Sequence, residues 1–159
     1  MNIKRESLKD TLVSRGLNAS YQRVRILGNL MERRDHPTVS MLYDALLNEI
    51  PTLARATVYN TLNALVEKGL VTALTIKPEE ACYDYKRERH HHFLCKRCGS
   101  ILDIEVRCAY ADVAEVEGHR VEDIHGYFKG TCRHCLRQER DAGARSKKPS
   151  QHHISRKGG

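Results

Sequence analysis

The sequence predicts an α+β protein in which a winged-helix unit is followed by a smaller α+β unit held together by a metal ion. The first observation is a change in the apolar period, from that of helices to that of strands, just after Gly69. The second is the presence of two Cys-x-x-Cys pairs, Cys95/Cys98 and Cys132/Cys135. The third is length. A chain of 159 residues forms one compact unit or two small ones, and each of two would bury little core and benefit from a metal ion or a partner chain.

Four apolar stripes before Gly69 predict four short helices. The second helix follows Ser20 and the third follows Thr38, and both residue types cap helices well. The fourth helix begins after Pro51-Thr52 and spans about residues 53–68. The stripes contain Leu8 and Leu12, then Val24, Leu27, Leu30 and Met31, then Val39, Leu42, Leu46 and Ile50, and finally Val58, Leu62 and Leu65.

Two strand-like stretches, Leu70–Ile76 and Ala81–Tyr85, follow the fourth helix and are joined by a turn. Helices followed by such a hairpin are typical of the winged helix, whose last helix enters the DNA major groove while the wing contacts phosphate. The exposed face of the fourth helix carries Arg55, Thr57, Tyr59, Asn60 and Asn63, which suit base and phosphate contacts. An ordinary solvated face is the alternative, but the net charge of +7 and the following hairpin favour DNA.

These patterns predict a winged-helix DNA-binding domain over residues 1–85, a hinge over 86–89 and a dimerisation and metal-binding domain over 90–139. Within the second domain we expect strands over 91–93 and 101–106, a helix over 108–117 and a strand over 119–128. Residues 140–159 are basic, lack apolar periodicity and are expected to be a disordered tail.

The cysteine pairs predict a structural Zn²⁺ site formed by Cys95, Cys98, Cys132 and Cys135. Two tight turns each present two thiolates, and four thiolates close the tetrahedral shell of the ion, so the site performs no chemistry. Disulfides are the alternative, but the chain opens without an export signal and a reducing cytoplasm is the expected location. No apolar run is long enough to span a membrane, so no membrane partner is expected.

A second set of ligands, with nitrogen and oxygen donors, consists of His36, Asp84, His90, His92 and Asp103. An extended segment would turn His90 and His92 to one side, and Pro37 is expected to hold His36 in an extended conformation. Such donors favour Fe²⁺, Mn²⁺ or Zn²⁺ as a regulatory ion. Solvated histidines are the alternative interpretation of each residue taken singly.

Several motifs, in order and at matching spacing over residues 5–138, resemble the ferric uptake regulator family of metal-dependent repressors. The motifs are His36-Pro37-Thr38, Ala56-Thr57-Val58-Tyr59-Asn60-Thr61-Leu62, Gly69-Leu70-Val71, Tyr83-Asp84, His90-His91-His92-Phe93-Leu94-Cys95-x-x-Cys98-Gly99 and Gly130-x-Cys132-x-x-Cys135. The resemblance implies a homodimer that binds an inverted-repeat operator in double-stranded DNA, a zinc that stabilises the dimer domain, and a regulatory Fe²⁺ or Mn²⁺ between the domains.

Within this family the ligand positions are most similar to those of the peroxide-sensing repressors. Iron-uptake regulators typically carry Glu where this chain has Asp103. The resemblance implies that bound Fe²⁺ reacts with peroxide, that His36 or His90 is oxidised, and that DNA is then released. The Mn²⁺ form would bind DNA without reacting.

Some residues depart from the family pattern. His125 lies one residue from a histidine of an additional site in some members, and Arg89 replaces another, so no third site is expected. Cys82 and Cys108 are extra thiols, for which ligation, redox sensitivity or simple packing are open. The alternative functions are an iron- or zinc-responsive uptake regulator, a non-haem iron oxygenase and a zinc-ribbon adaptor; we expect a regulator and not an enzyme.

Overall fold

The computed structural model describes residues 5–77, 79–85, 90–106, 113–122, 124 and 126–146. The helices are α1 (Arg5–Ser14), α2 (Tyr21–Glu32), α3 (Val39–Leu47), α4 (Arg55–Glu67) and α5 (Arg133–Ser146). The strands are β1 (Val71–Leu74), β2 (Cys82–Tyr85), β3 (His91–Cys95), β4 (Ile101–Ile104), β5 (Glu115–Val116), β6 (His119–Arg120) and β7 (Tyr127–Gly130). The predicted hinge over 86–89, Cys108, His125 and residues 147–159 lie outside the described residues.

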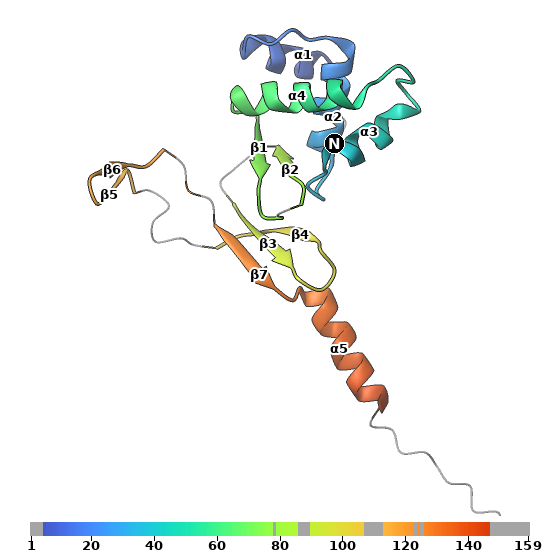
Figure 1. Ribbon diagram of the computed structural model, residues 1–159, viewed down its shortest axis with the longest axis vertical. Coiled ribbons are helices and arrows are strands. Elements are labelled where there is room, and N and C mark those ends of the chain that lie inside the picture. Colours follow the sequence, from blue (N-terminus) through green and yellow to red (C-terminus); the bar gives the residue numbers. More distant parts are fainter. Residues whose placement is uncertain are drawn as a thin grey trace, which may run out of the picture.

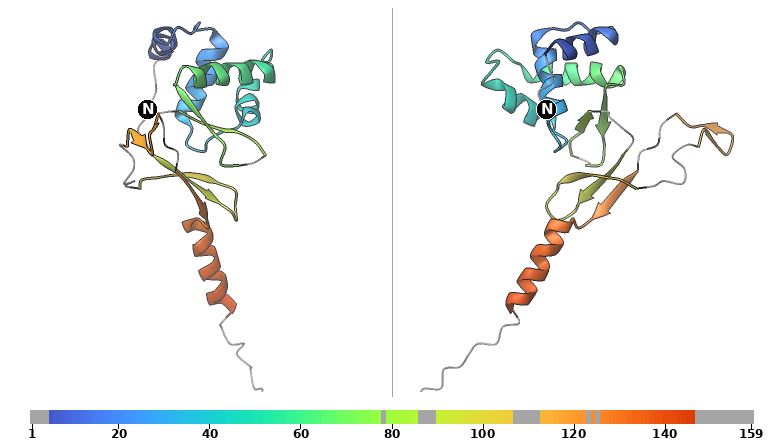
Figure 2. Two further views of the ribbon diagram at one scale, coloured as in Figure 1. Left: turned by 60° about the vertical axis from the view of Figure 1, so that its left-hand side comes forward. Right: turned by 180° about the vertical axis from the view of Figure 1, so that it is seen from behind.

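The molecule is elongated, with α1–α4 at one end and α5 at the other (Figure 1). Strands β1–β4 and β7 lie between them, and the β5–β6 hairpin projects to one side. In both views of Figure 2, α5 points away from the N-terminal helices.

The predicted starts of the second and third helices are confirmed. The Ser20 hydroxyl accepts a hydrogen bond from the backbone N–H of Arg23, and the Thr38 hydroxyl accepts one from Met41, each at 3.3 Å. The stripes of all four helices pack into one core, whose most buried members include Leu12, Ile26, Leu27, Leu42, Leu46, Val58, Leu62 and Leu65. The four helices therefore form one bundle, and the face of α4 that does not pack into it remains at the surface.

The change of period after Gly69 coincides with the end of α4. Gly69 has φ +65°, and the backbone N–H groups of Gly69 and Leu70 donate to the carbonyls of Val66 and Leu65 at 2.9 Å each. This pattern is a Schellman motif, which needs a left-handed residue and therefore favours glycine. The chain then enters the predicted hairpin, in which β1 pairs antiparallel with β2 and Leu74 lies opposite Cys82.

The second half is built on a three-stranded sheet in the order β4-β3-β7. β3 pairs antiparallel with β4 and parallel with β7, so His92 lies between Asp103 and Tyr127. Because side chains alternate across a strand, His92 and Leu94 share one face of the sheet, and Phe93 lies on the other.

A small apolar cluster joins the two halves of the molecule. Leu74, Ile76 and Cys82 from the hairpin pack with Ile101 at the start of β4. Leu94 and Tyr127 are packed against this cluster. The hairpin therefore lies on the sheet face that carries His92, which brings the ligands of the two halves together.

The predicted helix over 108–117 is wrong for the part that the structure describes. Residues 115–120 form the hairpin β5–β6, with Val116 opposite His119. Glu117 and Gly118 have φ values of +49° and +82°, as the two central residues of a type I′ turn require. The Glu-Gly pair ends any helix here, and the predicted strand over 119–128 is divided into β6 and β7.

The predicted disorder of residues 140–146 is also wrong, because α5 extends to Ser146. Strong helix formers such as Gln138, Glu139, Arg140 and Ala142 continue the helix without an apolar stripe. Arg97 attaches this helix to the turn after β3, since its guanidinium donates to Glu139 Oε1 at 2.6 Å and to the Cys135 carbonyl at 3.2 Å.

Candidate metal centres

The four paired cysteines form one cluster at the base of α5. Cys95 ends β3, Cys98 lies in the following turn, Cys132 directly precedes α5 and Cys135 lies in its first turn. The sulfur atoms of Cys95 and Cys135 are 3.9 Å apart, as are those of Cys98 and Cys132, and all four lie within 4.8 Å of one another. A tetrahedron with Zn–S bonds of about 2.3 Å has edges of about 3.8 Å, so the four thiols fit zinc.

Electrostatics explains why this cluster suits a cation. Backbone N–H groups of Cys132 and Cys98 that point at the sulfur lower the pKa of Cys95 to about 6. Burial and the neighbouring sulfurs raise the pKa of Cys135 to about 12. Four thiolates in contact repel one another, and a divalent ion removes that repulsion by binding all four.

The five nitrogen and oxygen ligands come together from three separate segments. His36 lies between α2 and α3, Asp84 lies on β2, and His90, His92 and Asp103 belong to the sheet region. His36 Nε2 is 2.7 Å from Asp103 Oδ1 and 3.8 Å from Asp84 Oδ1. His90 Nε2 is 3.3 Å from Asp84 Oδ2 and 3.4 Å from Asp103 Oδ1. His92 Nε2 is 3.9 Å from an oxygen of each carboxylate.

The donor set fits a divalent ion such as Fe²⁺ or Mn²⁺. His90 Nε2 and His92 Nε2 face each other at 3.1 Å, close to the roughly 3 Å expected between adjacent ligands with bonds of about 2.1 Å. Two carboxylates supply two negative charges, and neutral imidazoles complete a mixed set that disfavours thiol-preferring ions. The side chains of His36 and His92 are buried, whereas that of Asp103 is 38% exposed, so this cluster is open on one side.

The backbone at His36 differs from the prediction. His36 has φ +50°, in the left-handed region, and is not extended as the following Pro37 indicated. The Pro37 carbonyl accepts a hydrogen bond from the Tyr83 N–H at 3.0 Å, which attaches this loop to β2 beside Asp84. A non-glycine residue in this conformation is strained, and such strain persists where surrounding contacts hold a functional side chain in place.

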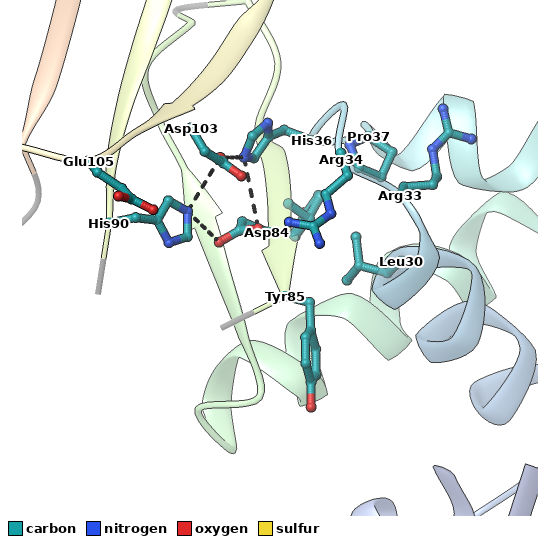
Figure 3. A pocket seen from close by; sticks show the side chains of 11 residues that line it. Leu30, Arg33, Arg34, His36, Pro37, Asp84, Tyr85, His90, Asp103 and Glu105 are labelled. Atoms are coloured by element: carbon teal, nitrogen blue, oxygen red, sulfur yellow. Dashed lines mark ion pairs between the residues drawn. The ribbon is translucent and has the colours of Figure 1, made fainter. Parts of the chain in front are cut away.

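A cavity of about 510 Å³ lies beside the nitrogen and oxygen cluster (Figure 3). It is lined by His36, Asp84, His90 and Asp103, and also by Arg33, Arg34, Leu30, Pro37, Tyr83, Tyr85 and Glu105. His92 is not among the lining residues. The cavity gives small molecules access to His36 and His90.

The sequence interpretation missed the residues that surround this cavity. Glu105 stands two positions after Asp103, and the alternation of side chains could have placed it beside that ligand. The adjacent Arg33 and Arg34 carry no motif, and only the loop between α2 and α3 brings them to the cavity.

Cys82 belongs to neither cluster. It is 1% exposed and packs with Leu74, Ile76 and Ile101 in the apolar contact between the halves. Burial raises the pKa of its thiol, which disfavours the reactive thiolate. Simple packing is therefore the role that its surroundings support.

The α4 residues that are predicted to contact DNA differ in their exposure and in their contacts. Tyr59 and Asn60 are exposed, while Thr57 and Asn63 are half-buried. The fifth residue, Arg55, is attached to α3.

Arg55 contacts three residues of α3. Its guanidinium donates a hydrogen bond to Ser40 Oγ at 3.0 Å and lies 3.7 Å from Asp44 Oδ1. Its Cζ atom lies 4.8 Å from the centroid of the Tyr43 ring. The α3 partners of Arg55 were not predicted, since only packing brings the two helices together.

The ferric uptake regulator family is the family whose sequence model matches the chain, over residues 14–126. The chain is 33% identical over 142 residues to the peroxide operon regulator of Bacillus subtilis (strain 168), covering 84% of this chain and 92% of that protein. It is 30% identical over 128 residues to the peroxide-responsive repressor PerR of Staphylococcus aureus (strain NCTC 8325 / PS 47), covering 76% and 83%.

Solved structures share the fold. The Vibrio cholerae ferric uptake regulator is 22% identical, with a TM-score of 0.64 over 78% of this chain and 98% of that one. The Helicobacter pylori ferric uptake regulator is 18% identical, with a TM-score of 0.68 over 84% and 95%. Among the described residues, no helix is long and apolar enough to cross a membrane.

Proposed function

Since the chain belongs to the ferric uptake regulator family, we propose that it is a metal-dependent repressor that responds to hydrogen peroxide. Members of this family are dimeric DNA-binding regulators and not enzymes, so the oxygenase alternative is removed. One observation supports the peroxide response most directly: a cavity opens on His36 and His90, which cluster with His92 and Asp103 and lie 3.8 Å and 3.3 Å from the Asp84 carboxylate. Two relatives at 30–33% identity are named for peroxide.

We propose that residues 1–85 bind DNA and that the exposed side of α4 enters the major groove. Tyr59 and Asn60 are free to reach the bases, while β1–β2 lies beside α4 as the wing. Two such units related by a two-fold axis would read an inverted-repeat operator in the cytoplasm, and the charge of +7 favours phosphate contacts.

We further propose that residues 90–139 form the dimer contact, with 86–89 as the hinge. Leu102 and Phe128, which flank Phe93 in the sheet, are 38% and 42% exposed, and Leu136 on α5 is 40% exposed. Exposed apolar side chains grouped on one sheet and an adjacent helix are typical of a surface that a second protomer covers. The cysteine cluster, with bound zinc, would stabilise this region.

The regulatory ion would be held by His36, Asp84, His90, His92 and Asp103. These ligands come from both halves of the chain, so binding favours the arrangement in which the hairpin lies on the sheet. An ion that binds one arrangement more tightly than another shifts the population towards it. Metal binding and DNA binding would therefore strengthen each other.

When bound by these ligands, Fe²⁺ would supply the redox chemistry that opens the O–O bond of peroxide beside the histidines, and the two electrons of the net reaction would come from the imidazole that is oxidised. His36 and His90 line the cavity, so one of them would receive the oxygen. An oxidised imidazole binds a metal poorly, and the contact between the halves weakens. DNA is then released.

The test compares the Fe²⁺ and Mn²⁺ forms of the protein under low peroxide, with oxygen addition mapped by peptide mass spectrometry and DNA affinity measured in parallel. We expect one added oxygen on the peptide containing His36 or His90, only in the Fe²⁺ form, together with DNA release. Oxidation confined to cysteines and reversed by a thiol reductant would disprove the histidine mechanism. Metal-dependent DNA binding that ignores peroxide would instead indicate an iron- or zinc-responsive uptake regulator.

A further inference from the structure

The cavity beside the regulatory cluster has two chemically different walls (Figure 3). One wall carries His36, His90 and three carboxylates, and Arg33 and Arg34 lie on the other. Its volume of about 510 Å³ is many times that of hydrogen peroxide. A small, neutral reactant in so large a space needs a hydrogen-bonding group to hold it against the reactive histidines.

The two arginines differ in their partners. Arg33 forms a two-pronged ion pair with Asp35, at 2.8 Å and 2.5 Å, and this hydrogen bonding raises the pKa of its guanidinium. Within the described part of the chain, Arg34 forms no ion pair. Figure 3 shows its guanidinium directed towards Asp84, and Arg34 also borders a second hollow together with Asp103. Arg34 therefore has donors available next to two of the metal ligands.

We propose that Arg34 is the positioning residue that binds hydrogen peroxide in this cavity. This inference rests on the proposed peroxide response. The planar guanidinium presents several N–H donors in a fixed geometry. It would orient peroxide towards His36 or His90 and stabilise the oxygen that departs, because negative charge develops there as the O–O bond breaks.

The overall reaction balances without another reactant. The O–O bond breaks, and one oxygen forms a new bond to a ring carbon of the histidine. The hydrogen displaced from that carbon moves to ring nitrogen as the oxo form develops, and the other oxygen leaves as water with both peroxide hydrogens. The imidazole loses two electrons and peroxide gains them. Arg34 donates hydrogen bonds throughout and transfers no proton.

The alternative role for Arg34 is simple compensation of Asp84, Asp103 and Glu105. A compensating charge would act on metal affinity, whereas a positioning residue acts on the reaction. Arg33→Ala provides a matched control, since this arginine lines the same cavity but is held by Asp35.

The experiment measures the second-order rate of histidine oxidation in the full-length Fe²⁺ form of wild type, Arg34→Ala, Arg34→Lys and Arg33→Ala. We expect Arg34→Ala to be slower by roughly tenfold or more, Arg34→Lys to be intermediate and Arg33→Ala to match wild type. Guanidinium ion, added far below denaturing concentrations, should accelerate Arg34→Ala only. Affinities for Mn²⁺ and for DNA should be unchanged in all variants.

A second measurement does not depend on the reaction. Azide, used as a small hydrogen-bonding probe of the Mn²⁺ form, should bind more weakly to Arg34→Ala than to Arg33→Ala or wild type. Wild-type oxidation rates or azide affinity in Arg34→Ala would overturn the inference while leaving the proposed function intact. A slower rate accompanied by tighter Mn²⁺ binding, as expected when a positive charge beside the carboxylates is removed, and without guanidinium rescue, would show that Arg34 only compensates charge. Absence of histidine oxidation in wild type would instead overturn the proposed function itself.

Discussion

The two candidate metal centres of this protein differ in composition, origin and access. The cysteine cluster takes its four ligands from the end of β3, the following turn and the start of α5, and Cys95, Cys132 and Cys135 are buried. The other cluster takes His36 from the N-terminal half and three ligands from the sheet region, and Asp84 of the N-terminal half lies 3.3 Å from His90. His36 and His90 of the second cluster line a cavity of about 510 Å³.

This difference separates a structural site from a switch. A closed set of four thiolates within one unit stabilises that unit whenever zinc is bound, and it offers no position for a reactant. A set shared between two halves stabilises one arrangement of those halves, so its occupancy or oxidation changes their relative population. The apolar contact of Leu74, Ile76 and Cys82 with Ile101 holds the two halves together, and with them the nitrogen and oxygen ligands of the shared site.

The largest expected effect is loss of the closed site. Cys95→Ser or Cys132→Ser should lose zinc and the dimer together, because zinc binding contributes on the order of 10 kcal/mol to folding of small metal-bound units. Zinc content and sedimentation velocity would be measured on the same samples. A stable dimer without zinc in either variant would contradict the structural assignment.

Removing one ligand of the shared site should act on regulation alone. In wild type, we expect Mn²⁺ to raise DNA affinity by about 5- to 150-fold. In His36→Ala, Mn²⁺ should leave DNA affinity almost unchanged. Zinc content should stay at the wild-type value, because His36 lies in the other half. Equal operator affinity with and without divalent metal in wild type would refute the switch.

A substitution on the DNA face should leave both centres intact. Tyr59→Ala should lower specific operator affinity by roughly 10- to 100-fold, and Arg55→Ala should weaken it as well, since Arg55 also joins α4 to α3. The fold and both metals should be retained, as circular dichroism and metal analysis would show. Val13→Ala, at an exposed position on α1, is the matched control. Normal operator binding by Tyr59→Ala would show that another face reads DNA.

The smallest effect is expected for the thiol outside both clusters. Cys82→Ala should keep zinc and Mn²⁺ affinity while lowering stability by about 1–2 kcal/mol, because it removes a buried sulfur from the contact between the halves. Denaturant unfolding and metal titration would measure the two quantities. Weakened Mn²⁺ binding without loss of stability would instead assign Cys82 to the metal site.

Much of the fold was predictable because its signals are local. Helix periodicity, the caps at Ser20 and Thr38 and the glycine that ends α4 each depend on residues a few positions apart. The Cys-x-x-Cys spacing likewise places two sulfurs on one turn. The hairpin at 115–120 was missed because its Glu-Gly turn follows an alanine-rich segment typical of a helix.

The sequence alone determined the residue types of both centres, the helices and wing, and the preference for a divalent ion with nitrogen and oxygen donors. Tertiary structure decided the left-handed backbone at His36, the cavity that reaches His36 and His90 but not His92, and the attachment of Arg55 to α3. It also brought Arg33 and Arg34 to the cavity beside the metal ligands. These features depend on contacts between segments distant in the chain, which local propensity does not encode.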